Sequence, residues 1–151
     1  MTEMYHFHNG VTLRDGSLVP PIGVKLVHSG PLTMCKVGFH AAPRIIDALK
    51  WAPGNILDGV ILSGERIDEG DKSVARERTR VWSINAEALL HEFARWAALQ
   101  VVHLWDAPPV VRKYLTTGDE TIRAAARDAQ EEKLQALVAT ARMAERAEDK
   151  P

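Results

Sequence analysis

The chain has 151 residues, of which 46% are hydrophobic and 26% are charged, a composition typical of a folded globular protein and not of a disordered chain. Its 19 Lys and Arg residues nearly balance its 20 Asp and Glu residues, so the net charge creates no general attraction to nucleic acid or to an anionic membrane. The single cysteine excludes an intramolecular disulfide, and no stretch approaches the roughly 20 apolar residues of a membrane span. These properties favour one soluble domain over residues 1–151 in a reducing cytoplasm.

The first 85 residues are expected to be mostly β. Residues 4–8 alternate in the manner of a strand, and Asp15 followed by Gly16 is a turn signal typical of hairpins. Four further apolar runs are predicted to be strands, at residues 24–28, 32–37, 56–63 and 79–84. Together these signals favour a mostly antiparallel sheet over residues 1–85.

One short helix is expected within this β-rich part. Pro43 suits the first turn of a helix, and the pair Pro53-Gly54 ends it. Four apolar residues at helical spacing form the face that we expect to pack on the sheet: Ile45, Ile46, Leu49 and Ala52.

Residues 65–77 are rich in charge and contain one glycine, which predicts an exposed connection and the most mobile segment of the first half. A local basic patch crosses from this segment into the next strand, and its members are Lys72, Arg76, Arg78 and Arg80. Phosphate contact through this patch is an alternative function. However, acidic neighbours dilute its charge and only Trp82 offers a ring for base stacking, so a solvated strand edge is favoured and nucleic-acid binding is not expected.

Residues 86–144 are expected to be helical. Asn85 suits the N-cap of a helix that runs to about Leu104. The apolar face of this helix, which we expect to lie in the core, consists of Leu90, Phe93, Ala97 and Val101. After the proline pair at 108–109, a short helix precedes a capping box at residues 117–120, where the last helix begins.

The last helix carries two apolar stripes that are out of step with each other. The first stripe is Ile122, Ala126 and Ala129, and the second is Leu134, Leu137, Val138 and Ala141. A bend or a change of packing partner near residues 131–132 would explain the slip. We therefore predict that the second stripe binds a protein partner or another copy of the chain. Residues 145–151 are polar and are expected to fray.

Six short segments spread over the chain form one pattern: residues 35–41 (CKVGFHA), 47–49 (DAL), 52–54 (APG), 71–75 (DKSVA), 103–108 (HLWDAP) and 117–120 (TGDE). This pattern resembles an uncharacterised family of phage and prophage proteins with a domain of unknown function. Relatives often extend their alanine-rich part into long helical repeats, and this chain departs from that pattern after Ala129. The resemblance implies a phage-associated accessory protein in the cytoplasm of a bacterial host cell. It supplies no catalytic residues.

A metal site is one alternative that the histidines raise. His6 and His8 would point from the same face of a strand, and Cys35 lies five positions before His40. Their spacing matches no standard ligand framework, since structural zinc sites show two closely spaced ligand pairs. We therefore expect no bound metal and no other cofactor.

An enzyme that transfers ADP-ribose from NAD is the second alternative. Such enzymes carry a His and a Gly on an early strand, then an aromatic residue beside a short helix, then a late Glu. His8, Gly10, Phe39 and Glu77 fit that order, although free spacing makes such a fit easy to obtain.

The sequence therefore predicts an α+β chain with a β-rich part, a helical part and a short tail. The function that it favours is non-enzymatic: a phage or prophage accessory protein that binds protein through its C-terminal helix, with a host or defence factor as one target. No membrane partner is expected.

Overall fold

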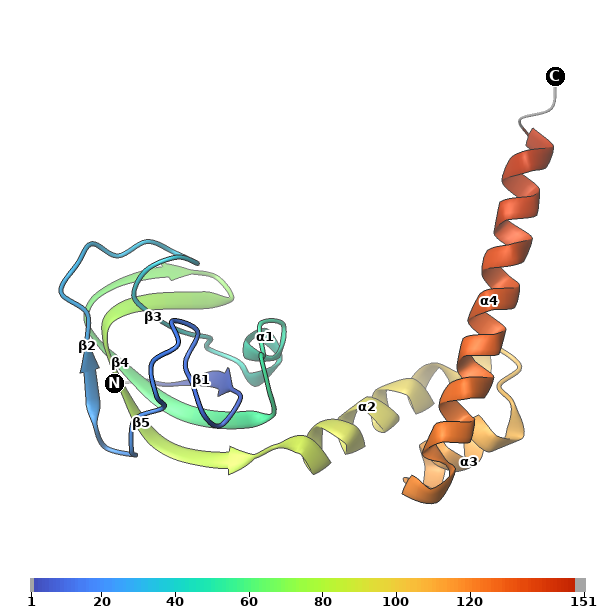
Figure 1. Cartoon of the computed structure of the whole chain (residues 1–151), viewed down its shortest axis with the longest axis horizontal. Helices are drawn as coiled ribbons and strands as arrows, with labels where there is room; N and C mark the ends of the chain where they lie inside the picture. Colours follow the sequence, from blue (N-terminus) through green and yellow to red (C-terminus); the bar gives the residue numbers. More distant parts are fainter. Residues whose placement is uncertain (1, 149–151) are drawn as a thin grey trace. The chain divides into compact units, whose positions relative to one another are not determined.

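The computed structural model describes residues 2–148, with side chains described as far as Met143. It contains two compact units, Met1–Ala88 and Leu89–Pro151, called here the sheet unit and the helical unit. The sheet unit holds all the strands and one short helix, and the helical unit holds helices alone, which confirms the predicted α+β class (Figure 1). The boundary lies close to the predicted division at residue 85, and the expectation of a single domain stays a prediction.

Five antiparallel strands make up the sheet of the sheet unit (Figure 1). They are β1 (Glu3–His8), β2 (Lys25–Val27), β3 (Phe39–Ala41), β4 (Ile56–Glu69) and β5 (Lys72–Asn85). β4 lies between β1 and β5, and the far edge of β5 pairs with β2 and β3 along successive stretches. The strands predicted at 4–8, 24–28, 56–63 and 79–84 therefore form. The last two, β4 and β5, are longer than predicted.

The sheet closes on itself where β3 ends. The backbone N–H of Tyr5 donates to the carbonyl of Ala42 at 2.8 Å, and the N–H of Ala42 donates back to Tyr5 at 2.9 Å. β1 is thus bonded on both edges, and β1, β4, β5 and β3 form a ring. One buried apolar cluster of this unit is Met4, Ala41, Val60, Leu62 and Ala75.

The prediction of a connection over residues 65–77 is wrong, although residues 65–70 are exposed as expected. β4 and β5 continue through this segment and turn only at Gly70 and Asp71. Val74 and Ala75 are fully buried, because β3 pairs with this end of β5. The many charges of this segment indicated solvent, and residues 65–70 are exposed, yet the consecutive residues Ser73, Val74 and Ala75 are covered by a strand distant in sequence.

The strand predicted at residues 32–37 does not form. The N–H groups of Lys36 and Val37 both donate to the carbonyl of Thr33, at 3.0 and 2.9 Å, and Cys35 adopts a left-handed φ of 62°. These bonds make a tight turn, so pairing with β5 begins only at Phe39.

The short helix is present as α1 (Ile45–Leu49), but the predicted apolar face is wrong. Ile45 and Ile46 are 43% and 47% exposed, whereas Asp47 and Ala48 are buried. The helix is little longer than one turn, and Asp47 binds Arg44 at 2.6 Å and Lys50 at 3.0 Å. These two bonds satisfy the buried carboxylate and fix which side of the helix faces inward.

The helical elements begin near the predicted signals (Figure 1). They are α2 (Glu87–Val101), η1 (Val102–Leu104), α3 (Pro109–Thr117), η2 (Glu120–Ile122) and α4 (Arg123–Glu148). The Asn85 side chain accepts from the N–H of Glu87 at 3.0 Å, as its capping role predicted. The predicted capping box at residues 117–120 does not form, because Thr117 is the last residue of α3. Instead the Asp119 side chain accepts from the N–H of Thr121 at 2.9 Å and caps η2, directly ahead of α4.

The core of the helical unit excludes most of the α2 face predicted to fill it. The buried residues of this core are Ala107, Val111, Leu115 and Ala126, and α2 packs on them with Ala98 and Leu99. Phe93 and Val101 are 45% and 50% exposed, Ala97 is exposed, and Leu90 is half-buried. The core meets only the last turns of α2, so the long apolar stripe stays largely outside it.

α4 continues as a helix to Glu148, so the predicted frayed segment 145–151 overlaps its last turn. Residues 149–151 lie outside the described residues. No helix within residues 2–148 combines the length and the apolar character needed to cross a membrane.

Candidate functional sites

The first candidate site is the distal strip of α4, defined as Leu134, Leu137, Val138 and Ala141. Leu134, Leu137 and Val138 are 55%, 56% and 50% exposed, and Ala141 is exposed as well. The earlier stripe behaves differently, because Ala126 is 1% exposed and Ala129 packs on the same core. α4 is one uninterrupted helix, so the shift between the two stripes does not mark a break in the helix. The first stripe packs on the core, and the second is exposed. The structure thus leaves the distal strip uncovered, as its predicted role requires.

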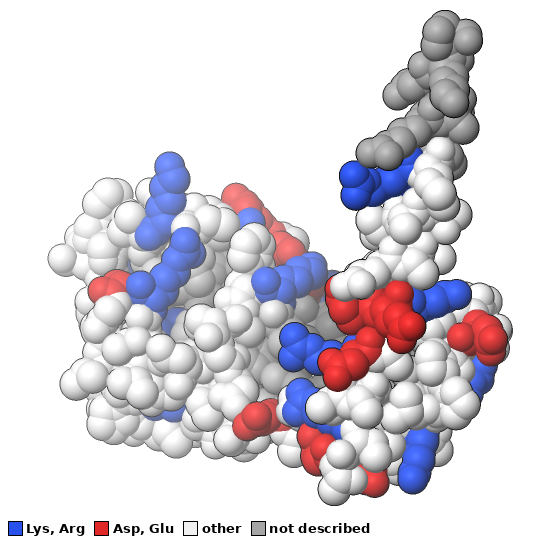
Figure 2. Space-filling view, turned by 45° about the vertical axis from the view of Figure 1, so that its right-hand side comes forward, with Lys and Arg blue, Asp and Glu red and all other residues white. Residues whose placement is uncertain are grey.

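Charged residues bracket the distal strip. Glu131 lies one turn before it and accepts from the Gln135 side chain at 3.0 Å, and Arg142 directly follows it. At 3.6 residues per turn, Glu131 and Arg142 fall on the same flank of the strip, at opposite ends. Figure 2 shows an uncharged stretch of α4 between an acidic group and a basic residue nearer the end of the helix.

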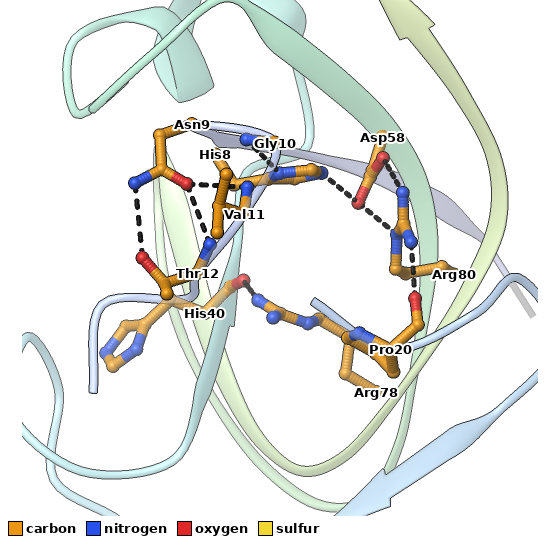
Figure 3. A network of polar contacts seen from close by, with 10 residues as sticks. All are labelled: His8, Asn9, Gly10, Val11, Thr12, Pro20, His40, Asp58, Arg78 and Arg80. Atoms are coloured by element: carbon orange, nitrogen blue, oxygen red, sulfur yellow. Dashed lines mark hydrogen bonds and ion pairs between the residues drawn. The ribbon is translucent and has the colours of Figure 1, made fainter. Parts of the chain in front are cut away.

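The second candidate site is a polar cluster inside the ring of strands, made of His6, His8, Asp58, Arg78 and Arg80. Figure 3 shows four of these residues, all but His6. The Arg80 Nε and Nη2 atoms donate to the two oxygens of Asp58 at 2.5 and 2.9 Å. His8 Nε2 lies 3.0 Å from the same carboxylate, and His8 Nδ1 accepts from the N–H of Gly10 at 2.9 Å. The Gly10 bond places the proton of His8 on Nε2, where it faces Asp58.

Arg78 occupies the same interior but lacks an acidic partner among residues 2–143. Its Nη1 donates to the carbonyl of His40 at 2.9 Å, and its guanidinium carbon lies 5.4 Å from the Phe39 ring centroid. Burial, and to a lesser degree the positive charge of Arg80, lowers the pKa of Arg78 to about 10, against the opposing attraction of Asp58 and Asp15. The side chain therefore remains charged near neutral pH.

His6 lies beside His8 in this interior, with ring centroids 6.1 Å apart and the rings stacked. Burial, followed by the positive charge of Arg78, lowers the pKa of His6 well below its ordinary value. His6 is therefore neutral near pH 7, and its Nδ1 is enclosed without a hydrogen-bond partner among the described side chains.

The residues considered for a metal site do not converge. His6 and His8 do share a face of β1, as predicted. His40, however, accepts through Nε2 from the N–H of Cys35 at 2.9 Å, in the tight turn before β3, where Cys35 is exposed. Within the part of the chain that the structure describes, no group of three or more His, Cys, Asp or Glu side chains is arranged to hold a metal ion.

The residues fitted to an ADP-ribosyltransferase are only partly brought together. Gly10 contacts His8 and Phe39 lies under Arg78, but Glu77 binds Lys25 at 2.9 Å and Ser63 at 2.7 Å. Glu77 precedes Arg78 on β5, so its side chain leaves the opposite face of the strand. The arrangement gives this Glu no place in the polar cluster.

The four basic residues also do not form an exposed patch. Arg78 and Arg80 are 4% and 9% exposed and serve the interior of the ring. Arg76 pairs with Glu65 and also donates to two backbone carbonyls, while Lys72 lies 3.5 Å from Glu69. The basic groups of these residues thus contact acidic groups and backbone carbonyls of the sheet unit itself.

Sequence reasoning missed Asp58 and the burial of the two arginines. The available signal was a lone carboxylate within the apolar run of residues 56–62, two positions before Val60 and therefore on the same inward face. No family model, curated protein or solved structure matches this chain.

Proposed function

We propose that this chain is a phage or prophage accessory protein that acts by binding protein, and that the distal strip of α4 pairs with the same strip of a second copy. The observation that carries the proposal is the exposure of Leu134, Leu137 and Val138 on consecutive turns of one helix. An apolar strip of this kind is stabilised when another amphipathic helix covers it. The resemblance to phage and prophage proteins supports the biological setting.

The charges beside the strip favour a second copy in antiparallel orientation. When two copies of the helix run in opposite directions, the Glu131 end of one lies beside the Arg142 end of the other. Leu134 then meets the region of Ala141, and Leu137 meets Val138. An antiparallel pair thus joins opposite charges and buries apolar residues together, whereas a parallel pair places the Glu131 and Arg142 flanks of the two copies on opposite sides of the interface, where these charges do not meet.

The test is to change Leu134→Gln and Leu137→Gln together in the full chain and to measure molar mass by light scattering over a range of concentrations. We expect the unmodified chain to form dimers and the double variant to be monomeric with an unchanged melting temperature. Ala139→Gln, on the opposite face of the same helix, is the matched control and should leave the dimer intact.

A monomeric unmodified chain at every concentration would contradict the pairing with a second copy. In that case a host or defence factor becomes the occupant to look for. A double variant whose melting temperature falls sharply would place the strip in the core of the chain and would contradict protein binding through it.

A further inference from the structure

The polar cluster contains one more positive charge than its acidic residue can balance. Its only carboxylate belongs to Asp58, and both oxygens of that group are taken by Arg80, with His8 as a third contact. Arg78 is buried beside them, and among residues 2–143 it forms no ion pair. The interior of the ring therefore holds a second guanidinium that has no direct ion-pair partner among residues 2–143, although Asp58 and Asp15 attract it from a greater distance.

Arg78 is also incompletely hydrogen-bonded. Only 4% of the residue is exposed, yet its Nε has no hydrogen-bond partner among the described residues. The His40 carbonyl and the Phe39 ring are its stabilising contacts, and both are neutral. A buried charge with an unmet donor is costly, so proteins keep such groups chiefly where an anion completes them.

We propose that the interior of the ring binds one oxyanion group, a carboxylate or phosphate of a small molecule, with Arg78 as its principal ligand and His6 as a second donor. A guanidinium offers parallel N–H groups that match two oxygens of such a group. The enclosed Nδ1 of His6 also has no hydrogen-bond partner among the described residues, and it can donate to an anion when it carries the ring proton. This site lies in the sheet unit and is independent of the distal strip.

The segment of residues 9–24 between β1 and β2 provides the route of entry. Most of its residues are exposed, and many of its bonds are local, such as Asn9 with Thr12 and Asp15 with Ser17. It is tied to β5 at Arg80, which donates to the carbonyl of Pro20 and accepts through its own carbonyl from Gly23 at 2.9 Å.

The experiment measures the melting temperature of the full chain in inorganic phosphate and in acetate, each against sodium chloride at equal ionic strength. A specific anion present at about ten times its Kd should raise the melting temperature by about 5 °C or more. Separate arms with phosphate and acetate show which oxyanion the site takes. An equal response to all three salts, or no response to either oxyanion, would overturn the proposal.

Arg78→Met identifies the residue responsible. We expect its melting temperature in chloride to match or exceed that of the unmodified chain, because an unbalanced charge is replaced by an apolar side chain, and we expect the oxyanion response to vanish. Arg76→Met, on the same strand but paired with Glu65, should keep the response. A purely structural Arg78 would instead give a lower melting temperature in chloride, with no oxyanion effect in any variant.

A second measurement keeps the proposal testable if Arg78→Met fails to fold. Phosphate or acetate is titrated into the unmodified chain while backbone amide signals are followed by NMR. Saturable shifts at Arg78 and His6 that chloride does not produce are expected. Shifts confined to exposed lysines would refute the site.

Discussion

Arg80 contacts both carboxylate oxygens of Asp58, through Nε at 2.5 Å and Nη2 at 2.9 Å, and the two residues are buried where β4 and β5 pair with a register shift. The same guanidinium donates to the carbonyl of Pro20 in the segment that leads to β2. One ion pair thus connects two central strands to the chain that covers them. The interior of the sheet unit is therefore held by polar contacts as well as by its apolar cluster.

Asp58→Asn should lower the free energy of unfolding by about 3–5 kcal/mol, because it leaves Arg80 charged and unbalanced in a buried site. Urea denaturation followed by circular dichroism measures this. Asp68→Asn is the control, since Asp68 pairs with Arg66 at the surface and its loss should matter much less. Equal effects of the two changes would mean that the Asp58 pair is open to water.

Leu115→Ala should cost about 2–5 kcal/mol of stability in the helical unit, because this side chain is 6% exposed in a packed core. Phe93→Ala should lower the free energy of unfolding by about 1 kcal/mol or less, because Phe93 is half exposed. Its aromatic contact is with Trp96 on the same helix, where the ring centroids lie 5.9 Å apart. Chemical denaturation of both variants gives the comparison. A Phe93 effect as large as that of Leu115 would show that the outer face of α2 is covered in solution.

The orientation of the proposed dimer can be tested with charges alone. Glu131→Arg should weaken dimer formation, because the new guanidinium of one copy then lies beside Arg142 of the other, and adding Arg142→Glu should restore the dimer. Sedimentation equilibrium at low salt measures the dimer constant, and high salt should reduce the differences. If adding Arg142→Glu fails to restore the dimer, the two charges do not meet and the helices do not run antiparallel.

The stability of the sheet unit should fall as the pH drops below about 6.5, the ordinary pKa of histidine. Burial lowers the pKa of His6 in the folded protein, so over this range the unfolded chain binds a proton that the folded chain does not. His40, whose pKa is also lowered by burial, adds to the effect. His6→Gln should therefore flatten the profile of urea midpoint against pH, while His103→Gln, in the helical unit, should leave it unchanged. A profile unaffected by His6→Gln would show that His6 is protonated inside the folded chain.

The sequence was sufficient for signals that act locally. Asn85 capped the start of α2, Pro109 began α3, and the alternation of residues 4–8 predicted β1, because each of these patterns depends on neighbours along the chain. The distal strip of α4 is exposed together with every other residue of 130–143, so the role predicted for it from the slip in helical spacing stays a prediction.

Errors arose where a partner distant in sequence decided the outcome. Val74 is buried because β3 covers it, although the charges around it indicated solvent. Phe93 is exposed because α3 and α4 reach only the last turns of α2. Arg78 and Arg80 looked like a basic surface, and only the closure of the ring at Tyr5 and Ala42 turns their face inward.

The closing bonds between Tyr5 and Ala42 also set an order for folding. β4 and β5 are joined by a tight turn and pair with near neighbours, so their hairpin has a low entropic cost of formation. The Tyr5 and Ala42 strands meet only after the long segments between β1, β2 and β3 have been arranged, which makes closure a late and slow step. Until that step, the arginines of β5 remain hydrated, so their desolvation, which is unfavourable, takes place only late in folding.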